Sequence, residues 1–213
     1  MADAKAALIR AGEHLFAREG VHQTRLRDLN EMAGQRNASA LHYHFGSREG
    51  LLRAIFERHS ATIDADRTSR LAALGADAPI RDIVAVILAP MADHLVLADG
   101  RDYLRILPQH LIGEVEPPAV VKAFDLARQD LDRRGLPKTL RDERLISMLR
   151  AATTLLAERA RAIEDGESLT LDAEAFTANL IDMATAMLTA PASSPARSPK
   201  KRTAASSTAQ VVR

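Results

Sequence analysis

The sequence predicts an all-α fold, and three observations support this. Aromatic residues make up 3% of the 213 residues, and no segment alternates β-branched and polar residues as a half-buried strand does. Ala, Leu, Arg and Glu, which favour helices, dominate the composition. Apolar residues recur at spacings of three and four, which place them on one face of a helix. We therefore expect a set of packed amphipathic helices.

The first 47 residues predict three short helices. The apolar positions of the first two share one face each, and they are Leu8, Leu15 and Phe16, then Leu26, Leu29 and Ala33. After the glycine turn at Gly34, Asn37 is suited to cap a third helix, because its side-chain oxygen accepts from a free backbone N–H. A helix this short is not stable alone. The two preceding helices must therefore brace it.

The third predicted helix is expected to have a polar outer face. If Leu41 points inward, the 100° step per residue places Ala38 and Phe45 on the same side. Ser39 and Tyr43 then lie opposite, flanked by Ala40 and His42. Two helices joined by a glycine turn, the second with a polar face, form a helix-turn-helix pattern. The second helix of such a motif enters the DNA major groove.

The remaining helices follow from caps, prolines and apolar stripes. Ser47 is suited to cap a long helix that runs to about Leu74, with a largely polar stretch over Ser60–Arg70 that predicts an exposed connector. Pro90 predicts a kink in the next helix, and Asp99-Gly100 predicts a break. The later helices are expected at Pro79–Ala98, Asp102–Gly113, Pro117–Arg134, Thr139–Glu164 and Asp172–Thr189.

Charge and composition divide the chain into three parts. Residues 1–47 form the predicted DNA-binding domain, residues 48–189 a helical ligand-binding and dimerisation domain, and residues 190–213 a Pro/Ser/Ala/Lys-rich tail expected to be disordered. Residues 1–60 hold nine Lys/Arg against seven Asp/Glu, residues 61–189 fifteen against twenty-one, and residues 190–213 five against none. The basic ends of the chain therefore favour binding to phosphate groups, and the acidic middle does not.

Several functional classes find no support in the residues. The chain has no cysteine, which excludes disulfides and thiolate sites and suits a reducing cytoplasm, where we expect the protein to act. It lacks an HExxH motif, a phosphate-binding glycine loop and a G-x-S-x-G elbow, so we expect no enzyme, no cofactor and no metal. His42 and His44 diverge by about 200° on a helix, which argues against a metal pair. No apolar run is long enough to span a membrane.

The N-terminal motifs resemble those of tetracycline-repressor-type (TetR family) transcriptional regulators over about Ala6–Phe56. The segments LFAREGVHQT, LRDLNEMAG and HYHFGSREGLL occur in the order typical of that family. Two departures are a turn that is one residue longer and His42 at the position of the usual aromatic, with Tyr43 after it. The resemblance implies a dimeric, ligand-responsive regulator, most often a repressor.

The resemblance also implies roles in DNA binding. Thr24 would cap the second helix and touch phosphate, Arg27 would reach a base edge, and His44 and Arg48 would contact the backbone. The helical periodicity adds four positions that face the groove, Ser39, Ala40, His42 and Tyr43, with Arg36 at the mouth of the groove. Two alternatives stay open: an exposed ion pair of Arg27 with Asp28, and packing of Tyr43 against the following helix.

The last two predicted helices offer a dimer interface, because paired with their symmetry mates they would form a four-helix bundle. The expected interface residues are Leu145, Leu149, Ala152, Leu156, Phe176, Leu180, Met183 and Met187. The alternative is that these stripes fill the internal core.

The middle helices are expected, through the resemblance, to surround a pocket for a small hydrophobic effector with a polar or acidic head. The candidate lining residues are Met91, His94, Tyr103, Arg105, Leu107, His110 and Phe124. The alternative is that this Met and Leu stripe is ordinary core.

The sequence therefore predicts a homodimer that binds an inverted repeat in double-stranded DNA and is released by a small molecule. The rival hypothesis is an architectural DNA-binding protein indifferent to sequence, which the acidic middle disfavours. The tail segment Arg197–Arg202 resembles short Ser-Pro-Lys-Lys units that bind the minor groove, although a solvated terminus is the preferred explanation.

Overall fold

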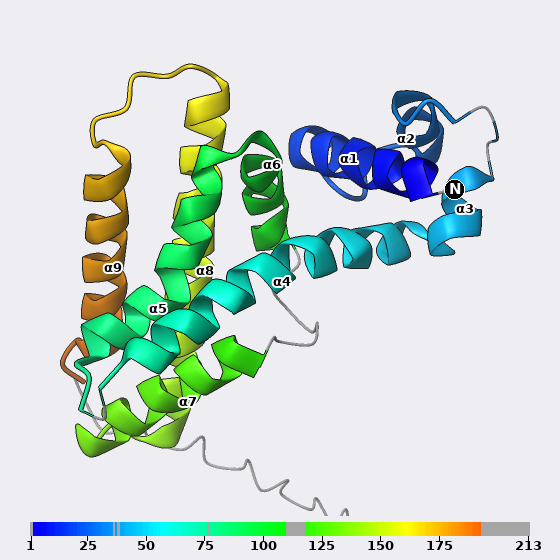
Figure 1. Ribbon diagram of the computed structural model, residues 1–213. Helices are drawn as coiled ribbons and strands as arrows, with labels where there is room; N and C mark the ends of the chain where they lie inside the picture. Colours follow the sequence, from blue (N-terminus) through cyan, green and yellow to red (C-terminus); the bar gives the residue numbers. More distant parts are fainter. Residues whose placement is uncertain (1, 36, 38, 76, 110–117, 193–213) are drawn as a thin grey trace, which may run out of the picture.

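The computed structural model describes residues 2–35, 37, 39–75, 77–109 and 118–192. Within those ranges every regular element is helical, as the composition predicts. The first three helices form a small unit at one end, and α4 runs from it into a larger helical body (Figure 1). The predicted disordered tail beyond residue 192 lies outside the described residues.

The N-terminal unit contains α1 (Ala2–Glu19), α2 (Leu26–Met32) and α3 (Ala40–Phe45), and α4 (Arg48–Ala73) closes it. Its core consists of fully or nearly fully buried apolar side chains: Leu8, Leu15, Phe16, Val21, Leu29, Leu41, Leu51, Leu52 and Ile55. Leu26 was expected to join this core but is 45% exposed, so that expectation was wrong. It lies three residues before Leu29 at the very start of α2, where the helix does not yet face α1.

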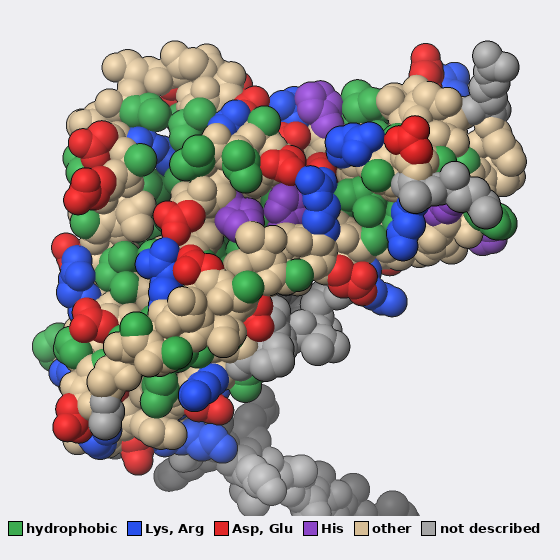
Figure 2. Space-filling model, in the orientation of Figure 1, with side chains coloured by type: hydrophobic (Ala, Val, Ile, Leu, Met, Phe, Trp, Pro, Cys, Tyr) green, Lys and Arg blue, Asp and Glu red, His purple; other side chains and the backbone are tan. Residues whose placement is uncertain are grey.

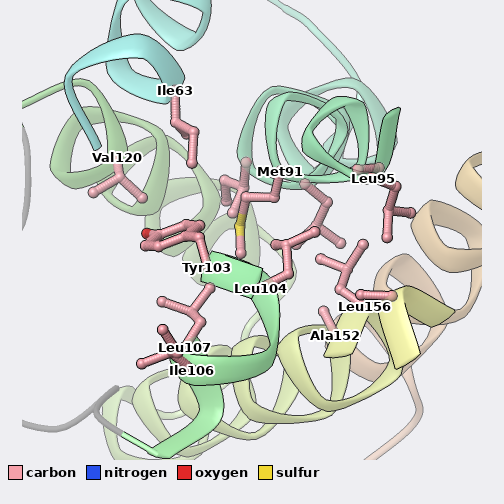
Figure 3. Packing of buried hydrophobic residues seen from close by; sticks show 14 of the residues in the cluster. Ile63, Met91, Leu95, Tyr103, Leu104, Ile106, Leu107, Val120, Ala152 and Leu156 are labelled. Carbon is pink, nitrogen blue, oxygen red and sulfur yellow. The ribbon is translucent and has the colours of Figure 1, made fainter. Parts of the chain in front are cut away.

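The body contains α5 (Ile80–Ala92), α6 (Ala98–Ile106), α7 (Pro118–Arg133), α8 (Lys138–Glu164) and α9 (Ala173–Thr189). Two short 3-10 turns, η1 (Asp93–Val96) and η2 (Leu107–Gln109), flank α6. Helix α5 is apolar on most sides and lies at the centre, in contact with α4, α7, α8 and α9. The core around it is shown in Figure 3.

The second half of α4 differs from the prediction of an exposed connector. Ile63 and Arg67 are 2% and 6% exposed, because this part of the helix packs against α5 and α7. Asp64 adds a link to α7, since its carboxylate accepts a hydrogen bond from the backbone N–H of Ala119 at 3.1 Å. That carboxylate satisfies a free donor in the first turn of α7.

The order of the predicted helices is correct, and some of their boundaries differ. Helix α5 continues two residues past Pro90 before it passes into η1. The predicted break at Asp99-Gly100 is wrong, since both residues lie in α6. A Cβ atom at Gly100 would come 2.2 Å from the carbonyl oxygen of His94. The glycine therefore allows a close backbone approach and does not end a helix.

Candidate DNA-binding surface and its coupling to the body

Helix α3 is held by its inner face. Leu41 is 2% exposed and Ala40 is 8% exposed, and α3 contacts both α2 and α4. The helix begins later than expected: Ser39 occupies the N-cap position, and the Asn37 side-chain oxygen accepts from the Ser39 backbone N–H at 2.9 Å. Asn37 therefore stabilises the turn that precedes α3 and does not cap its first turn.

The outer face of α3 is open to solvent. Ser39, His42 and Tyr43 are exposed, and Tyr43 shows 74% of its surface. The ring of Tyr43 meets the ring of His44 edge-on, with centroids 5.0 Å apart, and most of the Tyr43 side chain is open to solvent. The alternative that Tyr43 packs on the following helix is therefore wrong. A hydroxyl, an imidazole and a phenol on one exposed face can donate to and accept from base edges.

Two of the expected contact residues are buried. Thr24 is 0% exposed, and its hydroxyl donates to the carbonyl oxygen of Gly20 at 2.9 Å. It does not cap α2, whose N-cap is Arg25. Ala40 faces the core, so its assignment to the groove face was wrong. Arg36 and Ala38 lie outside the described residues.

The basic residues of the motif differ in solvent exposure and in the contacts that they already make. The Arg27 side chain is 80% exposed, with Nε 3.5 Å from an Asp28 carboxylate oxygen, so the ion pair and an accessible guanidinium coexist. Arg48 is half-buried and donates to the carbonyl oxygen of Val21, which ties α4 to the turn between α1 and α2. His44 is also half-buried. Sequence reasoning missed Arg25, which is exposed at the N-cap of α2; its position directly after Thr24 was the available signal.

Comparison with known proteins points to the same segment. A family model described as "Bacterial regulatory proteins, tetR family" matches residues 8–55, which span α1 to the first turns of α4. The N-terminal domain belongs to the tetR family. The chain is accordingly a DNA-binding transcriptional regulator with a helix-turn-helix, and proteins of this kind are generally not enzymes.

The remaining comparisons add little about function. No curated protein matches the chain. A solved structure titled "Crystal structure of superantigen PfiT" is similar at 19% identity, covering 86% of this chain and 95% of that one, with a TM-score of 0.42. In the part of the chain that is described, no helix is both long and apolar enough to cross a bilayer.

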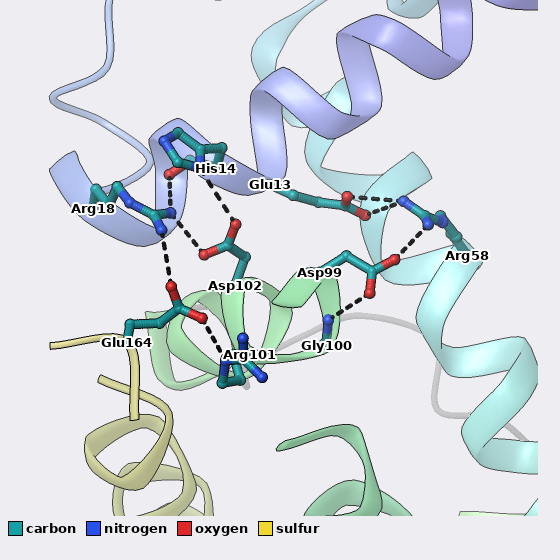
Figure 4. A network of polar contacts seen from close by, with 9 residues as sticks. All are labelled: Glu13, His14, Arg18, Arg58, Asp99, Gly100, Arg101, Asp102 and Glu164. Carbon is teal, nitrogen blue, oxygen red and sulfur yellow. Dashed lines mark hydrogen bonds and ion pairs between the residues drawn. The ribbon is translucent and has the colours of Figure 1, made fainter. Parts of the chain in front are cut away.

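A polar network joins the tetR-family domain to the body (Figure 4). Glu13 of α1 is 1% exposed and accepts two hydrogen bonds from Arg58 at 2.8 and 2.9 Å, while Arg58 also donates to Asp99 of α6 at 2.6 Å. The His59 ring lies 2.9 Å from Glu13. One buried carboxylate thus connects α1 with the middle of α4 and, through Arg58, with α6.

A second branch of the network starts from Arg18 at the end of α1. Its guanidinium lies 2.7 Å from Asp102 and 3.5 Å from Glu164, and Arg101 also pairs with Glu164. Burial raises the pKa of the Asp102 carboxyl, and the hydrogen bond from Arg18 opposes that shift. Together the two branches link α1 to α4, α6 and α8 by ion pairs and hydrogen bonds.

The candidate effector residues lie in several environments. Four of them are buried in the core, as expected if they are ordinary core residues: Met91, Tyr103, Leu107 and Phe124. Arg105 is half-buried, and His110 lies outside the described residues. The His94 ring is half-buried beside His59 and Tyr103, and burial lowers its pKa.

The expected dimer residues divide in the same way. Leu145, Ala152, Leu156 and Leu180 are buried inside the protomer, so their assignment to a partner-facing surface was wrong. Leu149 and Phe176 are half-buried, and Phe176 lies under the Arg159 guanidinium at 4.8 Å. Met183 and Met187 are 41% and 37% exposed.

An exposed apolar surface remains on the last two helices. Leu155, which sequence reasoning missed, is 37% exposed and lies one turn from Arg159, on the side of α8 that faces α9. We call Leu155, Met183 and Met187 the α8–α9 face. Figure 1 shows α9 beside α8, with α9 at the edge of the body farthest from α3. Elsewhere on the visible face of the body, acidic and basic side chains are interspersed (Figure 2).

Proposed function

We propose that this protein is a dimeric repressor that reads an inverted-repeat operator through the exposed face of α3 and leaves it when a small molecule binds the body. The observation that carries the proposal is the exposure of Ser39, His42 and Tyr43 on a helix whose opposite face is buried. Such an arrangement presents side chains to a groove while the protein core fixes their aim.

The contacts divide into two classes. Arg25 and Arg27, which are exposed beside α2, are proposed to contact phosphate and a base edge respectively. Ser39, His42 and Tyr43 are proposed to read sequence, with His44 and Arg48 at the margin. Phosphate contacts fix position and base contacts fix specificity. Residues 1–47, completed by the first turns of α4, are the proposed DNA-binding domain, and the rest of the helices form the regulatory body.

Dimerisation is proposed because one short recognition helix reads too few base pairs to find a genomic site. The α8–α9 face is the candidate interface, since its exposed apolar side chains lie on two antiparallel helices that can pair with a symmetry mate. Effector control is proposed to act through the Glu13 and Arg18 networks, because they couple α1 to the helices of the body.

Selection of bound DNA from a random pool tests this proposal. The full chain is expected to enrich one inverted repeat at moderate salt, since each subunit contributes one half-site. Enrichment of single half-sites would contradict the dimer. Equal retention of all sequences would contradict sequence readout and favour an architectural DNA-binding protein.

A further inference from the structure

Arg67 is a buried cation, and among the described residues no carboxylate lies within ion-pairing distance of its side chain. It lies in the second half of α4 and is 6% exposed, and it is the only buried lysine or arginine among the described residues. One Nη donates to the carbonyl oxygen of Ile87 at 3.0 Å. The Nε atom is buried and has no hydrogen-bond partner. A buried, incompletely satisfied guanidinium is costly, so its presence calls for an explanation.

The nearby carboxylates are occupied elsewhere. Asp64 accepts from the backbone N–H of Ala119 at 3.1 Å, and Asp66 pairs with Arg70 at 2.9 Å. Neither comes within ion-pairing distance of Arg67 in the described part of the chain. Burial lowers the pKa of Arg67, while Tyr103, Asp64 and Asp66 act weakly in the opposite direction. An arginine nevertheless stays protonated in a protein interior, so the charge is present.

Tyr103 supplies a second polar group at the same place. Its side chain is 4% exposed, and burial raises the pKa of its hydroxyl to about 12, an effect that the charge of Arg67 reduces. The hydroxyl is therefore a neutral donor at physiological pH. Figure 3 shows the Tyr103 ring on the side of the core where Ile63 of α4 and Val120 of α7 lie. The surroundings of Tyr103 therefore combine these apolar side chains with the ring of His59, whose centroid lies 4.5 Å from that of the Tyr103 ring.

We infer that Arg67 binds the carboxylate of an apolar organic acid between α4, α5, α6 and α7, with the Tyr103 hydroxyl as a second donor. The unpartnered Nε and an Nη of Arg67 match the two oxygens of one carboxylate. A single buried guanidinium neutralises one negative charge, which favours a monocarboxylate over a phosphate dianion. The buried aliphatic neighbours Ile63, Met91 and Val120 fit an apolar body on that acid.

This inference rests on the proposed function in one respect: the acid is taken to be the effector. A ligand bound to Arg67 can affect the DNA-binding domain through α4. The same helix carries Leu51, Leu52 and Ile55, which belong to the N-terminal core.

The test uses the full chain and measures its melting temperature with matched probes. Octanoate and 3-phenylpropionate are compared with octanamide and 3-phenylpropanamide, which have the same shape and no charge. We expect each carboxylate, at about 5 mM, to raise the melting temperature by at least about 3 °C more than its amide. Equal shifts for acid and amide would overturn the inference.

Arg67→Met decides whether the guanidinium is the anchor. We expect the ligand-free variant to melt at or above the wild-type temperature, because an uncompensated buried charge has been replaced by an apolar chain of similar length. We also expect the preference for carboxylates to disappear. Arg70→Met, three residues along the same helix and exposed, should retain the wild-type preference. A ligand-free Arg67→Met protein that melts several degrees lower, or one that keeps the preference, would overturn the assignment.

A second variant covers the case in which Arg67→Met does not fold. Tyr103→Phe keeps the ring and removes the hydroxyl, and it should reduce the extra carboxylate shift by at least half. An unchanged shift would remove Tyr103 from the site. DNA release is measured separately by fluorescence anisotropy on the selected operator. Carboxylate binding without DNA release would sustain the site and contradict its role as the effector site.

Discussion

Tyr43 is the residue whose exposure says most about function. An aromatic side chain that leaves 74% of its surface in water gains little from packing. Leu41, on the opposite side of α3, is 2% exposed, so the packing of this helix relies on its inner face and not on Tyr43. The exposed phenol is explained if the partner that covers it is DNA.

We expect Tyr43→Ala to weaken binding to the selected operator by about 10- to 100-fold, because a lost base contact costs about 1–3 kcal/mol. The melting temperature should stay within about 2 °C of the wild type, since the side chain contacts little of the protein. Fluorescence anisotropy on operator and scrambled DNA measures the effect. Val96→Ala, at an exposed position of 77% in the body, is the control; an equal loss on scrambled DNA would assign Tyr43 to non-specific contact.

His94 should make stability depend on pH. Burial lowers its pKa below the ordinary value of 6.5, while its Nδ1 lies 3.0 Å from the Pro90 carbonyl oxygen. The unfolded chain therefore binds the proton more readily than the folded chain, and stability is lost as pH falls below 6.5. His94→Asn, whose amide can keep the contact with Pro90, should show a shallower fall in melting temperature from about pH 7.5 to about pH 5.5. Parallel curves for the two proteins would contradict this.

Individual residues were harder to predict than the surface to which they belong. The 100° periodicity correctly placed Ser39 and Tyr43 outside and Leu41 inside. It misplaced Ala40, because the orientation of the neighbouring helix decides whether a residue at the border of two faces is buried. Arg67 could not be found at all from the sequence. Its stretch reads as polar, and only the packing of α4 on α5 and α7 buries the guanidinium.

At the scale of elements, the α3–α4 corner depends on one glycine. Gly50 lies in the first turn of α4, and a Cβ atom there would come 1.9 Å from the Phe45 carbonyl oxygen at the end of α3. The backbone cannot yield without moving α3. The recognition helix and α4 therefore approach each other only because position 50 has no side chain.

We expect Gly50→Ala to destabilise the protein by about 1–3 kcal/mol, as overpacking of a rigid contact does. The matched control is Gly75→Ala, where nothing lies within 4 Å of the added methyl group. That variant should be neutral or slightly stabilising, because it restricts the unfolded chain. Urea denaturation of the two variants measures the difference, and equal stabilities would show that α3 relaxes away from α4 at no cost.

The Glu13 network should matter for stability more than the surface ion pairs. Arg58→Ala removes two hydrogen bonds from a carboxylate that is 1% exposed and leaves His59 as its neighbour, so we expect a loss of about 1–3 kcal/mol. Arg70→Ala removes ion pairs to Asp66 and Asp93, all of them well exposed, and should cost at most about 1 kcal/mol. Equal costs by urea denaturation would show that solvent replaces Arg58 at Glu13.

The order of the elements was predictable, because each apolar stripe is long and ends at a proline, a glycine or a capping residue. Their ends were less predictable. Gly100 looked like a helix breaker, whereas its lack of a side chain admits the His94 carbonyl into the first turn of α6. A close approach between segments leaves no signature that distinguishes it from a turn in a single sequence.

At the scale of the whole molecule, the sequence could not separate internal core from subunit interface. The stripe on α8 and α9 was predicted correctly as apolar, yet Leu156 and Leu180 fill the protomer core, and Met183 and Met187 face solvent. An amphipathic pattern predicts which residues are buried. Whether such a residue is buried within the protomer or in a subunit interface depends on the position of α5.

We expect Met183→Glu combined with Met187→Glu to convert a dimer into a monomer, because two carboxylates on each subunit would be buried against their mates. Light scattering at micromolar concentration should report twice 23.2 kDa for the wild type and 23.2 kDa for the variant. Operator affinity should fall by at least about 100-fold, whereas the melting temperature changes little. Ile146→Glu, at an exposed position beside α7, is the control and should stay dimeric. A monomeric wild type would contradict the assignment.

The unbroken length of α4 has a mechanical consequence. Its 26 residues form a rod of about 39 Å, and the distance from Arg67 back to Leu51 is about 24 Å along the axis. A pivot of about 10° at the Arg67 end would displace the other end by about 4 Å, slightly more than the spacing of about 3.4 Å between stacked base pairs. Such a tilt of α4 would shift each recognition helix by about one base-pair step of the duplex, enough to misalign the two α3 helices with their two half-sites.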